Sequence, residues 1–341
     1  MKRSIAAFLA VATCAIGCQR LIDRQVDRTL TRVDEGVLRS PDLQVVLCGT
    51  GSPLVDPDRA AACTAVIAGG HFFLVDVGPG SARVVNLANL PLDHLEGVLL
   101  THFHSDHIGD LGEAMTQSWI AGRSQPLDVY GPTGVAAVVG GFGAAYAADV
   151  DARVLHHGDS YMPRAASGAV AHEIALPDSE GPQADAVVFD RDGLRITMFR
   201  VDHDPVRPAV GYRFDFGGRS VVISGDTKKS ASVAAHAKGA DLLVHEALAA
   251  EFTARAVEGA KRLGMTRLAK LAGDIPGYHT TPREAGEVAA EAGAAHLVLT
   301  HLVPAPSNVI MRRAFKNDAS EAFDGEVTVG EDGMRFALAP R

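Results

Sequence analysis

The stretch Leu99-Leu100-Thr101-His102-Phe103-His104-Ser105-Asp106-His107-Ile108-Gly109-Asp110 places three histidines and an aspartate within six residues. An apolar strand leads into this stretch, and a helix is expected to follow it. On an extended backbone His102 and His104 project to the same side, because side chains alternate with a period of two. Two imidazoles in that register can bind one divalent cation, and Asp106 and His107 can face a second where the chain turns. The stretch therefore predicts a metal centre at the end of a strand.

The HxHxDH pattern resembles the signature of the metallo-β-lactamase superfamily, and further motifs match that family in order. Asp76 resembles an aspartate that supports the metal loop without binding metal. His203 resembles the third ligand of the first metal, Asp226 the carboxylate that bridges both metals, and His301 the last ligand of the second. The resemblance covers roughly residues 42–305. It implies two divalent cations, zinc first and manganese or iron as alternatives, held by His102, His104, Asp106, His107, His203, Asp226 and His301.

The same resemblance implies an α/β fold, a four-layer αββα sandwich that forms a single catalytic domain over residues 41–341. The residue pattern agrees, because short β-rich runs alternate with helical segments from Asp42 onward. The expected strands are Leu43–Cys48, Cys63–Ala68, Phe72–Val77, Gly97–Thr101, Leu127–Tyr130, Leu194–Val201, Ala209–Phe216, Ser220–Ser224, Leu242–His245 and His296–Thr300. The expected helices are Ser81–Asn89, Ile108–Ile120, Val135–Ala148, Lys229–Lys238 and Pro282–Ala292, the last with Thr281 as N-cap.

Two further motifs resemble the ribonuclease Z and arylsulfatase branch of the superfamily. They are Val244-His245-Glu246-Ala247 and Gly277-Tyr278-His279-Thr280-Thr281. The resemblance assigns Glu246 as the residue that orients His279, and His279 as the residue that stabilises charge or protonates the leaving oxygen. Asp106 completes the predicted catalytic set, because with Asp226 it would fix a metal-bound hydroxide as the nucleophile. The expected reaction is hydrolysis without a covalent enzyme intermediate.

The expected substrate follows from charge and from one short connection. The chain of 341 residues carries 32 Lys and Arg against 41 Asp and Glu, a net charge of −9, which argues against a surface built for nucleic-acid phosphates. Only 22 residues separate His203 from Asp226, too few for the long arm of ribonuclease Z, and no other Lys- and Arg-rich insertion is expected to replace it. We therefore expect small sulfate or phosphate esters as substrates and no nucleic-acid partner. Lactonase or β-lactamase activity and an arm-less ribonuclease Z-like transfer-RNA 3′ endonuclease are the alternatives.

The N-terminus is predicted to direct export. Basic residues at 2 and 3 precede an apolar run over residues 5–17, which is too short to span a bilayer but fits a signal peptide. The run ends at Cys18 in a pattern that resembles a lipoprotein box, although Ala10-Val11-Ala12 also suits an ordinary signal peptidase. Residues 1–17 are thus expected to be a signal peptide and residues 18–40 a helical spacer. The mature protein would be periplasmic or anchored in a bacterial membrane through lipid on Cys18.

Two further properties stay open at this level. Cys48 and Cys63 lie near the ends of two neighbouring predicted strands, so they form either a disulfide in an oxidising compartment or two separate buried thiols. The oligomeric state is not fixed by the sequence, a dimer included.

Overall fold

Two mixed β-sheets pack face to face in a computed structural model that describes residues 19, 21–27, 31–177 and 184–341. Within these residues each sheet has seven strands. The first sheet has the order β14 (Arg335–Leu338), β1 (Leu43–Gly49), β2 (Cys63–Ala68), β3 (His71–Val75), β4 (Leu95–Leu99), β5 (Leu127–Pro132) and β6 (Ala169–Ile174). The second has the order β13 (Glu326–Val329), β12 (His296–Val303), β11 (Leu242–Leu248), β10 (Arg219–Ile223), β9 (Val210–Phe216), β8 (Leu194–Arg200) and β7 (Asp185–Arg191).

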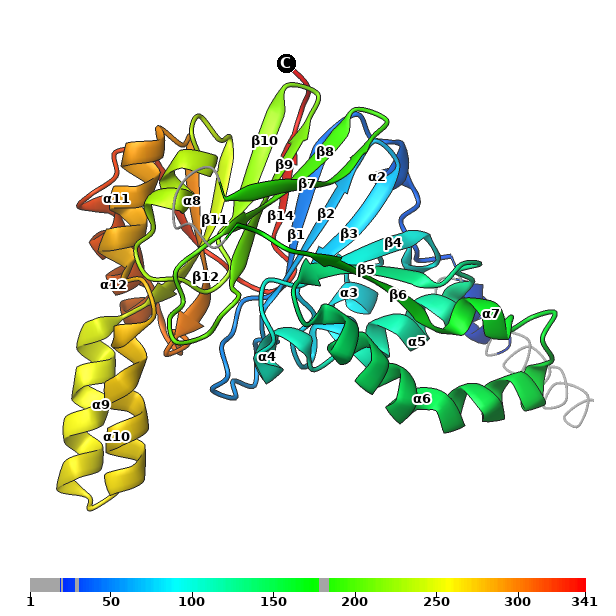
Figure 1. Cartoon of the computed structure of the whole chain (residues 1–341), viewed down its shortest axis with the longest axis horizontal. Helices are drawn as coiled ribbons and strands as arrows, with labels where there is room; N and C mark the ends of the chain where they lie inside the picture. Colours follow the sequence, from blue (N-terminus) through cyan, green and yellow to red (C-terminus); the bar gives the residue numbers. More distant parts are fainter. Residues whose placement is uncertain (1–18, 20, 28–30, 178–183) are drawn as a thin grey trace, which may run out of the picture.

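Helices cover the outer face of each sheet, so the predicted four-layer αββα sandwich is confirmed (Figure 1). The first sheet is covered by α2 (Gly36–Arg39), α3 (Ser81–Leu87), η1 (Leu92–His94), α4 (Ser105–Ile108), α5 (Leu111–Ala121), α6 (Val135–His157) and α7 (Arg164–Ser167). The second is covered by α8 (Ala231–His236), α11 (Pro282–Ala292) and α12 (Val309–Ser320). Thr281 caps α11 in a capping box with Glu284, as expected.

Side chains alternate along each strand and so contribute to two different hydrophobic cores, one between the sheets and one between a sheet and its helices. On β1, Val45 and Leu47 point between the two sheets, whereas Val46 and Cys48 point toward the helices outside the first sheet. A strand buried on both faces reads as a continuous apolar run, which explains why β1 and β2 were predictable. Both sheets end their parallel strands at one edge of the sandwich. In open α/β sheets that edge is where ligands bind.

The sequence did not predict the edge strands β6, β7, β13 and β14, nor α7 and α12. Strand β6 has no fully buried residue and β7 has one, so their apolar content is too low for the pattern to stand out. Helix α6 extends to His157, beyond the predicted Ala148. Val150 and Val154 pack against Trp119 there and hold the extra turns in place.

The segment predicted as a helical spacer is helical at residues 21–27 and again at Gly36–Arg39, with residues 31–35 outside both helices. Leu21, Ile22 and Val26 are exposed, and among the described residues of the expected apolar face only Val37 is buried. The predicted signal peptide, including Cys18, lies outside the described residues.

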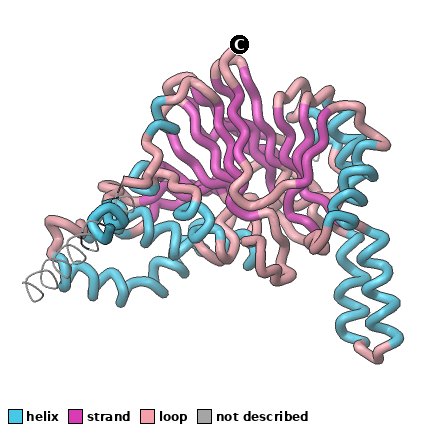
Figure 2. The backbone as a smooth tube through the Cα atoms, turned by 180° about the vertical axis from the view of Figure 1, so that it is seen from behind, coloured by secondary structure: helices cyan, strands magenta, loops and turns pink. Residues whose placement is uncertain are grey.

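A helical hairpin, formed by α9 (Ala250–Arg262) and α10 (Thr266–Asp274), extends away from the sandwich (Figures 1 and 2). A short helix η2 (Ile275–Gly277) returns the chain to the body. The hairpin carries five basic side chains, at Arg255, Lys261, Arg262, Arg267 and Lys270. Three acidic side chains, Glu251, Glu258 and Asp274, accompany them, so the hairpin has an excess of two basic residues and no Lys- and Arg-rich run in the sequence.

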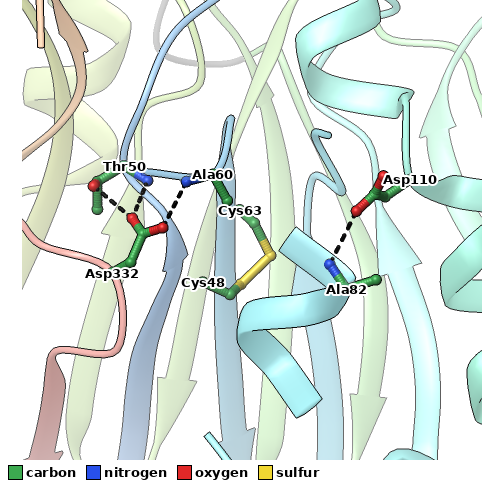
Figure 3. The surroundings of a disulfide bond; sticks show 7 residues. All are labelled: Cys48, Thr50, Ala60, Cys63, Ala82, Asp110 and Asp332. Carbon is green, nitrogen blue, oxygen red and sulfur yellow. Dashed lines mark hydrogen bonds between the residues drawn. A yellow bond between two sulfur atoms is a disulfide. The ribbon is translucent and has the colours of Figure 1, made fainter. Parts of the chain in front are cut away.

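Cys48 and Cys63 form a disulfide between β1 and β2, which settles the alternative left open by the sequence (Figure 3). The bond closes the loop between the two strands at its base. The Asp332 carboxylate then holds both ends of this loop, since it accepts hydrogen bonds from the Thr50 amide and hydroxyl and from the Ala60 amide at 2.6–3.0 Å. The loop is thus tied to the turn that precedes β14.

We expect the double substitution Cys48→Ala/Cys63→Ala to lower the free energy of unfolding by about 3 kcal/mol, because the bond closes a loop of 15 residues. Urea unfolding with and without reductant measures this. Reductant should destabilise the wild type by a similar amount and leave the double variant unchanged. Equal stability of the two proteins without reductant would contradict the expectation.

Candidate metal centre

The Asp226 carboxylate lies in the middle of a buried cluster of imidazoles. Its Oδ2 is 3.3 Å from Nε2 of both His107 and His301, and 3.9–4.0 Å from Nε2 of His203 and His102. Asp226 follows β10, His102 and His107 follow β4, His203 follows β8, and His301 lies in β12. The packing of two sheets therefore brings together residues that are up to 199 positions apart.

All seven predicted metal ligands belong to this cluster. His102, His104, His203 and Asp226 form one group whose ligand atoms lie within 4.8 Å of one another. Asp106, His107 and His301 form a second group, of three residues, whose ligand atoms lie within the same distance, and Asp226 also groups with His301 and His279. Asp226 thus lies between two potential cation positions, as the bridging carboxylate was expected to do.

The donor set fits two divalent cations. Nε2 of His102, His107 and His203 is buried without a hydrogen-bond partner among the described residues, an arrangement that buried polar atoms rarely tolerate. Burial lowers the pKa of His102 well below its ordinary value and that of His203 to about 4, so both rings are neutral and can donate lone pairs. Imidazole and carboxylate ligands suit zinc, and also manganese and iron.

Hydrogen bonds to the far side of two rings fix which nitrogen faces the cluster. Nδ1 of His107 donates to Oδ2 of Asp76 at 2.7 Å, and Nδ1 of His203 donates to the Tyr278 carbonyl at 2.9 Å. Each ring is then held with Nε2 free, the second-sphere arrangement typical of metal-binding histidines. Asp76 also accepts from the amide and hydroxyl of Thr101 at 2.7–2.8 Å. These contacts match the supporting role that the sequence assigned to Asp76.

Backbone geometry at two of these residues is unusual. Asp76 and His301 have positive φ values of 58° and 45°, a region that non-glycine residues rarely occupy. His301 is also the extra residue at a register shift, where Glu246 pairs with Thr300 but Ala247 pairs with Leu302. Such a β-bulge redirects a side chain. Here it turns the His301 ring toward Asp106 and Asp226.

Glu246 and His279 form a buried pair beside the cluster. Oε1 of Glu246 accepts hydrogen bonds from Nδ1 of His279 at 2.8 Å and from the Thr227 amide at 2.9 Å. Burial opposes a charge on His279, but Glu246 and Asp226 outweigh this effect and raise its pKa to about 9. The His279 ring is 5.2 Å from that of His203 and 5.5 Å from that of His301. The Glu246 carboxylate therefore favours the protonated form of an imidazole that lies beside the proposed cation positions.

The sequence missed the supporting residues Thr101, Thr227 and Tyr278. Thr101 and Tyr278 each precede a predicted site histidine, but both act through partners distant in sequence. The Thr101 amide and hydroxyl donate to Asp76, and the Tyr278 carbonyl accepts from His203. Thr227 contributes a backbone amide, for which no side-chain signal exists. His245 belongs to none of these potential metal-binding groups: its Nδ1 donates to the Glu246 carbonyl at 2.8 Å, and burial lowers the pKa of its ring to about 4.

Comparisons with known proteins agree with this geometry. A family model described as a β-lactamase superfamily domain matches residues 71–302. The chain belongs to the metallo-β-lactamase superfamily. Its clustered ligands and family membership make it a metal-dependent hydrolase of this fold.

The chain is similar to curated relatives and to solved structures. The chain is 37% identical over 304 residues to ribonuclease Z of Mycobacterium bovis, covering 88% of this chain and 99% of the relative. Among solved structures, human tRNase Z, short form, is 22% identical with a TM-score of 0.60, covering 87% of this chain and 99% of that chain. The metallo-β-lactamase fold protein YhfI from Bacillus subtilis is also 22% identical, with a TM-score of 0.59 and the same coverage. These two structures support the shared fold.

We expect about two divalent cations per purified chain, as in other paired-metal hydrolases. His301→Ala should reduce the content to about one, since only the group of Asp106 and His107 loses a ligand. Metal analysis by inductively coupled plasma mass spectrometry measures this. His236→Asn is the matched control, because that buried histidine lies outside the cluster and should retain both cations. Two cations in the His301→Ala protein would contradict the assignment.

Substituting the buried pair should impair activity while the cations stay bound. We expect His279→Ala to lower kcat by about 10²–10⁴, the range of a lost general acid.

Glu246→Gln removes the charge that raises the pKa of His279, so the alkaline fall of the rate should move to lower pH. The pH profile of bis(4-nitrophenyl) phosphate hydrolysis tests this. An unchanged profile in Glu246→Gln would show that Glu246 does not set the protonation of His279.

Proposed function

We propose that this protein hydrolyses phosphodiester bonds of RNA and cuts at the 3′ ends of transfer-RNA precursors. The observation that carries the proposal is the buried Glu246–His279 pair beside a seven-residue metal centre, in a chain that matches nearly the full length of relatives named ribonuclease Z. The same match favours this reaction over the small-ester hydrolysis that net charge predicted. Charge averaged over a whole chain says little about a local binding surface.

Residues His102, His104 and His203 would hold one divalent cation, and Asp106, His107 and His301 the other, with Asp226 shared. Such a pair of cations lowers the pKa of water and neutralises charge on a phosphodiester. The chain's own part is to place these ligands rigidly and to exclude bulk water around them, since all of them except His104 are buried. Rigid, pre-oriented charges stabilise a transition state better than mobile solvent does.

His279 is placed to handle the leaving group. Its Nδ1 proton is held by Glu246, so Nε2 is the nitrogen that can donate to an oxygen at the centre. The Glu246 carboxylate raises the pKa of His279, which favours the form of the ring that carries this proton. As the ester bond breaks, donation from Nε2 to the departing 3′ oxygen would neutralise its charge. The resulting neutral imidazole would remain hydrogen-bonded to Glu246.

Hydrolysis of small sulfate or phosphate esters is a second candidate function. It is favoured by the short link between β9 and β10, a tight turn at Gly217 and Gly218 that adds no substrate-binding segment there. The predicted export of the mature chain also supports it, because exported protein would not meet transfer-RNA precursors in the cytoplasm.

A substrate panel distinguishes these functions. Metal-loaded protein is given a transfer-RNA precursor with a 3′ trailer, bis(4-nitrophenyl) phosphate, 4-nitrophenyl sulfate and an N-acyl homoserine lactone, with His279→Ala as the control. We expect cleavage at the trailer junction with the highest kcat/KM, and slower hydrolysis of the small phosphodiester. Sulfate hydrolysis without RNA cleavage would overturn the proposal in favour of the small-ester function. Activity on the lactone alone would overturn both.

A further inference from the structure

The α9–α10 hairpin is joined to the catalytic pair at both of its ends. Helix α9 begins two residues after β11, the strand that carries Glu246, and α10 leads through η2 to Tyr278 and His279. The junction is fixed by backbone hydrogen bonds from Leu248 to the Thr280 carbonyl and from Ala249 to the Val303 carbonyl, both 2.8 Å. Whatever the hairpin binds is therefore held at a set position relative to His279.

The outer end of the hairpin is basic and fully exposed. Residues 261–268 are all exposed and include Lys261, Arg262 and Arg267 without a single acidic residue. Lys261 pairs with Glu258, whereas Arg262 and Arg267 form no ion pair within the described part of the chain. A chain with a net charge of −9 thus presents a local cationic surface at the end of a projecting element. We call residues 261–268 the hairpin tip.

The distance from the tip to the catalytic pair limits what the tip can contact. Helix α9 has 13 residues, which at the rise of an α-helix gives a length of about 20 Å. A nitrophenyl ester at the metal centre is much shorter than that. Only a macromolecular substrate can reach the tip while its scissile bond lies at the centre.

The packing of the hairpin makes it a stiff extension. Thr253 and Ala260 of α9 and Ala269 of α10 are buried, and Val257 lies against Gly273, so the two helices pack closely along their length. The exposed side chains at the tip therefore sit on a defined support. An anion bound there would be held at a defined position relative to the catalytic pair.

We propose that the hairpin tip binds the phosphate backbone of the RNA substrate at a distance from the scissile bond. This inference rests on the proposed function and names the surface that selects RNA over small phosphodiesters. Phosphates neutralised by Arg and Lys release counterions, which gives binding a strong dependence on salt. The chain as a whole carries a net charge of −9, so a local group of basic side chains gives phosphates an attraction that the overall charge opposes. Tip contacts then raise the affinity for RNA without taking part in bond cleavage.

The test compares Arg262→Glu/Arg267→Glu with a matched control, Arg313→Glu/Lys316→Glu. The control reverses two charges at exposed positions of α12, outside the hairpin and the metal centre. Each protein is assayed on a transfer-RNA precursor at several salt concentrations and on bis(4-nitrophenyl) phosphate. Metal content and thermal unfolding are measured on the same preparations. Binding to vesicles with and without an anionic lipid is measured in parallel.

For the tip variant we expect KM for RNA to rise about tenfold or more at low salt, with kcat nearly unchanged. The slope of log(kcat/KM) against log[salt] should fall by about 1.5, since two phosphate contacts are lost. Rates on the small phosphodiester should equal those of the wild type. The control variant should keep the wild-type KM and salt slope.

Three outcomes would contradict this inference or its basis. Equal RNA kinetics and salt slopes in the tip variant and wild type would overturn the role of the hairpin while leaving the proposed function intact. Loss of vesicle binding in the tip variant with unchanged RNA kinetics would assign the tip to an anionic membrane surface instead. A wild type that hydrolyses the small phosphodiester but not RNA would overturn the proposed function itself.

Discussion

The buried carboxylate of Asp226 is the constraint on which the rest of the structure depends. A carboxylate removed from water is strongly unfavourable unless positive charge or hydrogen-bond donors compensate for the lost hydration. Asp226 is only 3% exposed and lies within 4.0 Å of four imidazole nitrogens. Charges on His301 and His107 overcome the effect of burial and hold the pKa of Asp226 well below its usual value. Divalent cations would provide this compensation more fully, and the surrounding strand ends keep the carboxylate in place to receive them.

Much of the fold and most of the candidate site could be predicted from the sequence, the HxHxDH stretch from its residue pattern and His203, Asp226 and His301 from the resemblance to the superfamily. The HxHxDH stretch follows buried β4, and Asp226 follows buried β10. Each motif therefore comes after a run of apolar residues that predicts a strand. The supporting contacts of Thr101 and Tyr278 could not be found in this way, because they depend on where the second sheet lies relative to the first. Edge strands such as β6 were missed since partly exposed positions give no clear alternation.

The hairpin shows a different limit of sequence reasoning. Its basic residues are interspersed with acidic side chains and with exposed Leu263 and Met265, so no long run of positive charge stands out along the chain. The fold places residues 261–268, with Arg262 and Arg267, at the exposed end of the hairpin. Net charge predicted a surface unsuited to nucleic acid. The sum over the whole chain is −9, whereas the hairpin itself carries five basic and three acidic side chains. The location of charge, set by the fold, is more informative about a substrate than its sum.

In the metal-loaded protein we expect Asp226 to lie between two cations, each held by ligands from both sheets. Anomalous diffraction at the zinc edge from crystals of the metal-loaded protein tests it most directly. The account predicts two peaks about 3.5–4 Å apart, the usual spacing of paired-metal sites, one within bonding distance of His102, His104 and His203 and the other of Asp106, His107 and His301. A single peak, or two peaks of which neither lies within bonding distance of Asp226, would contradict it.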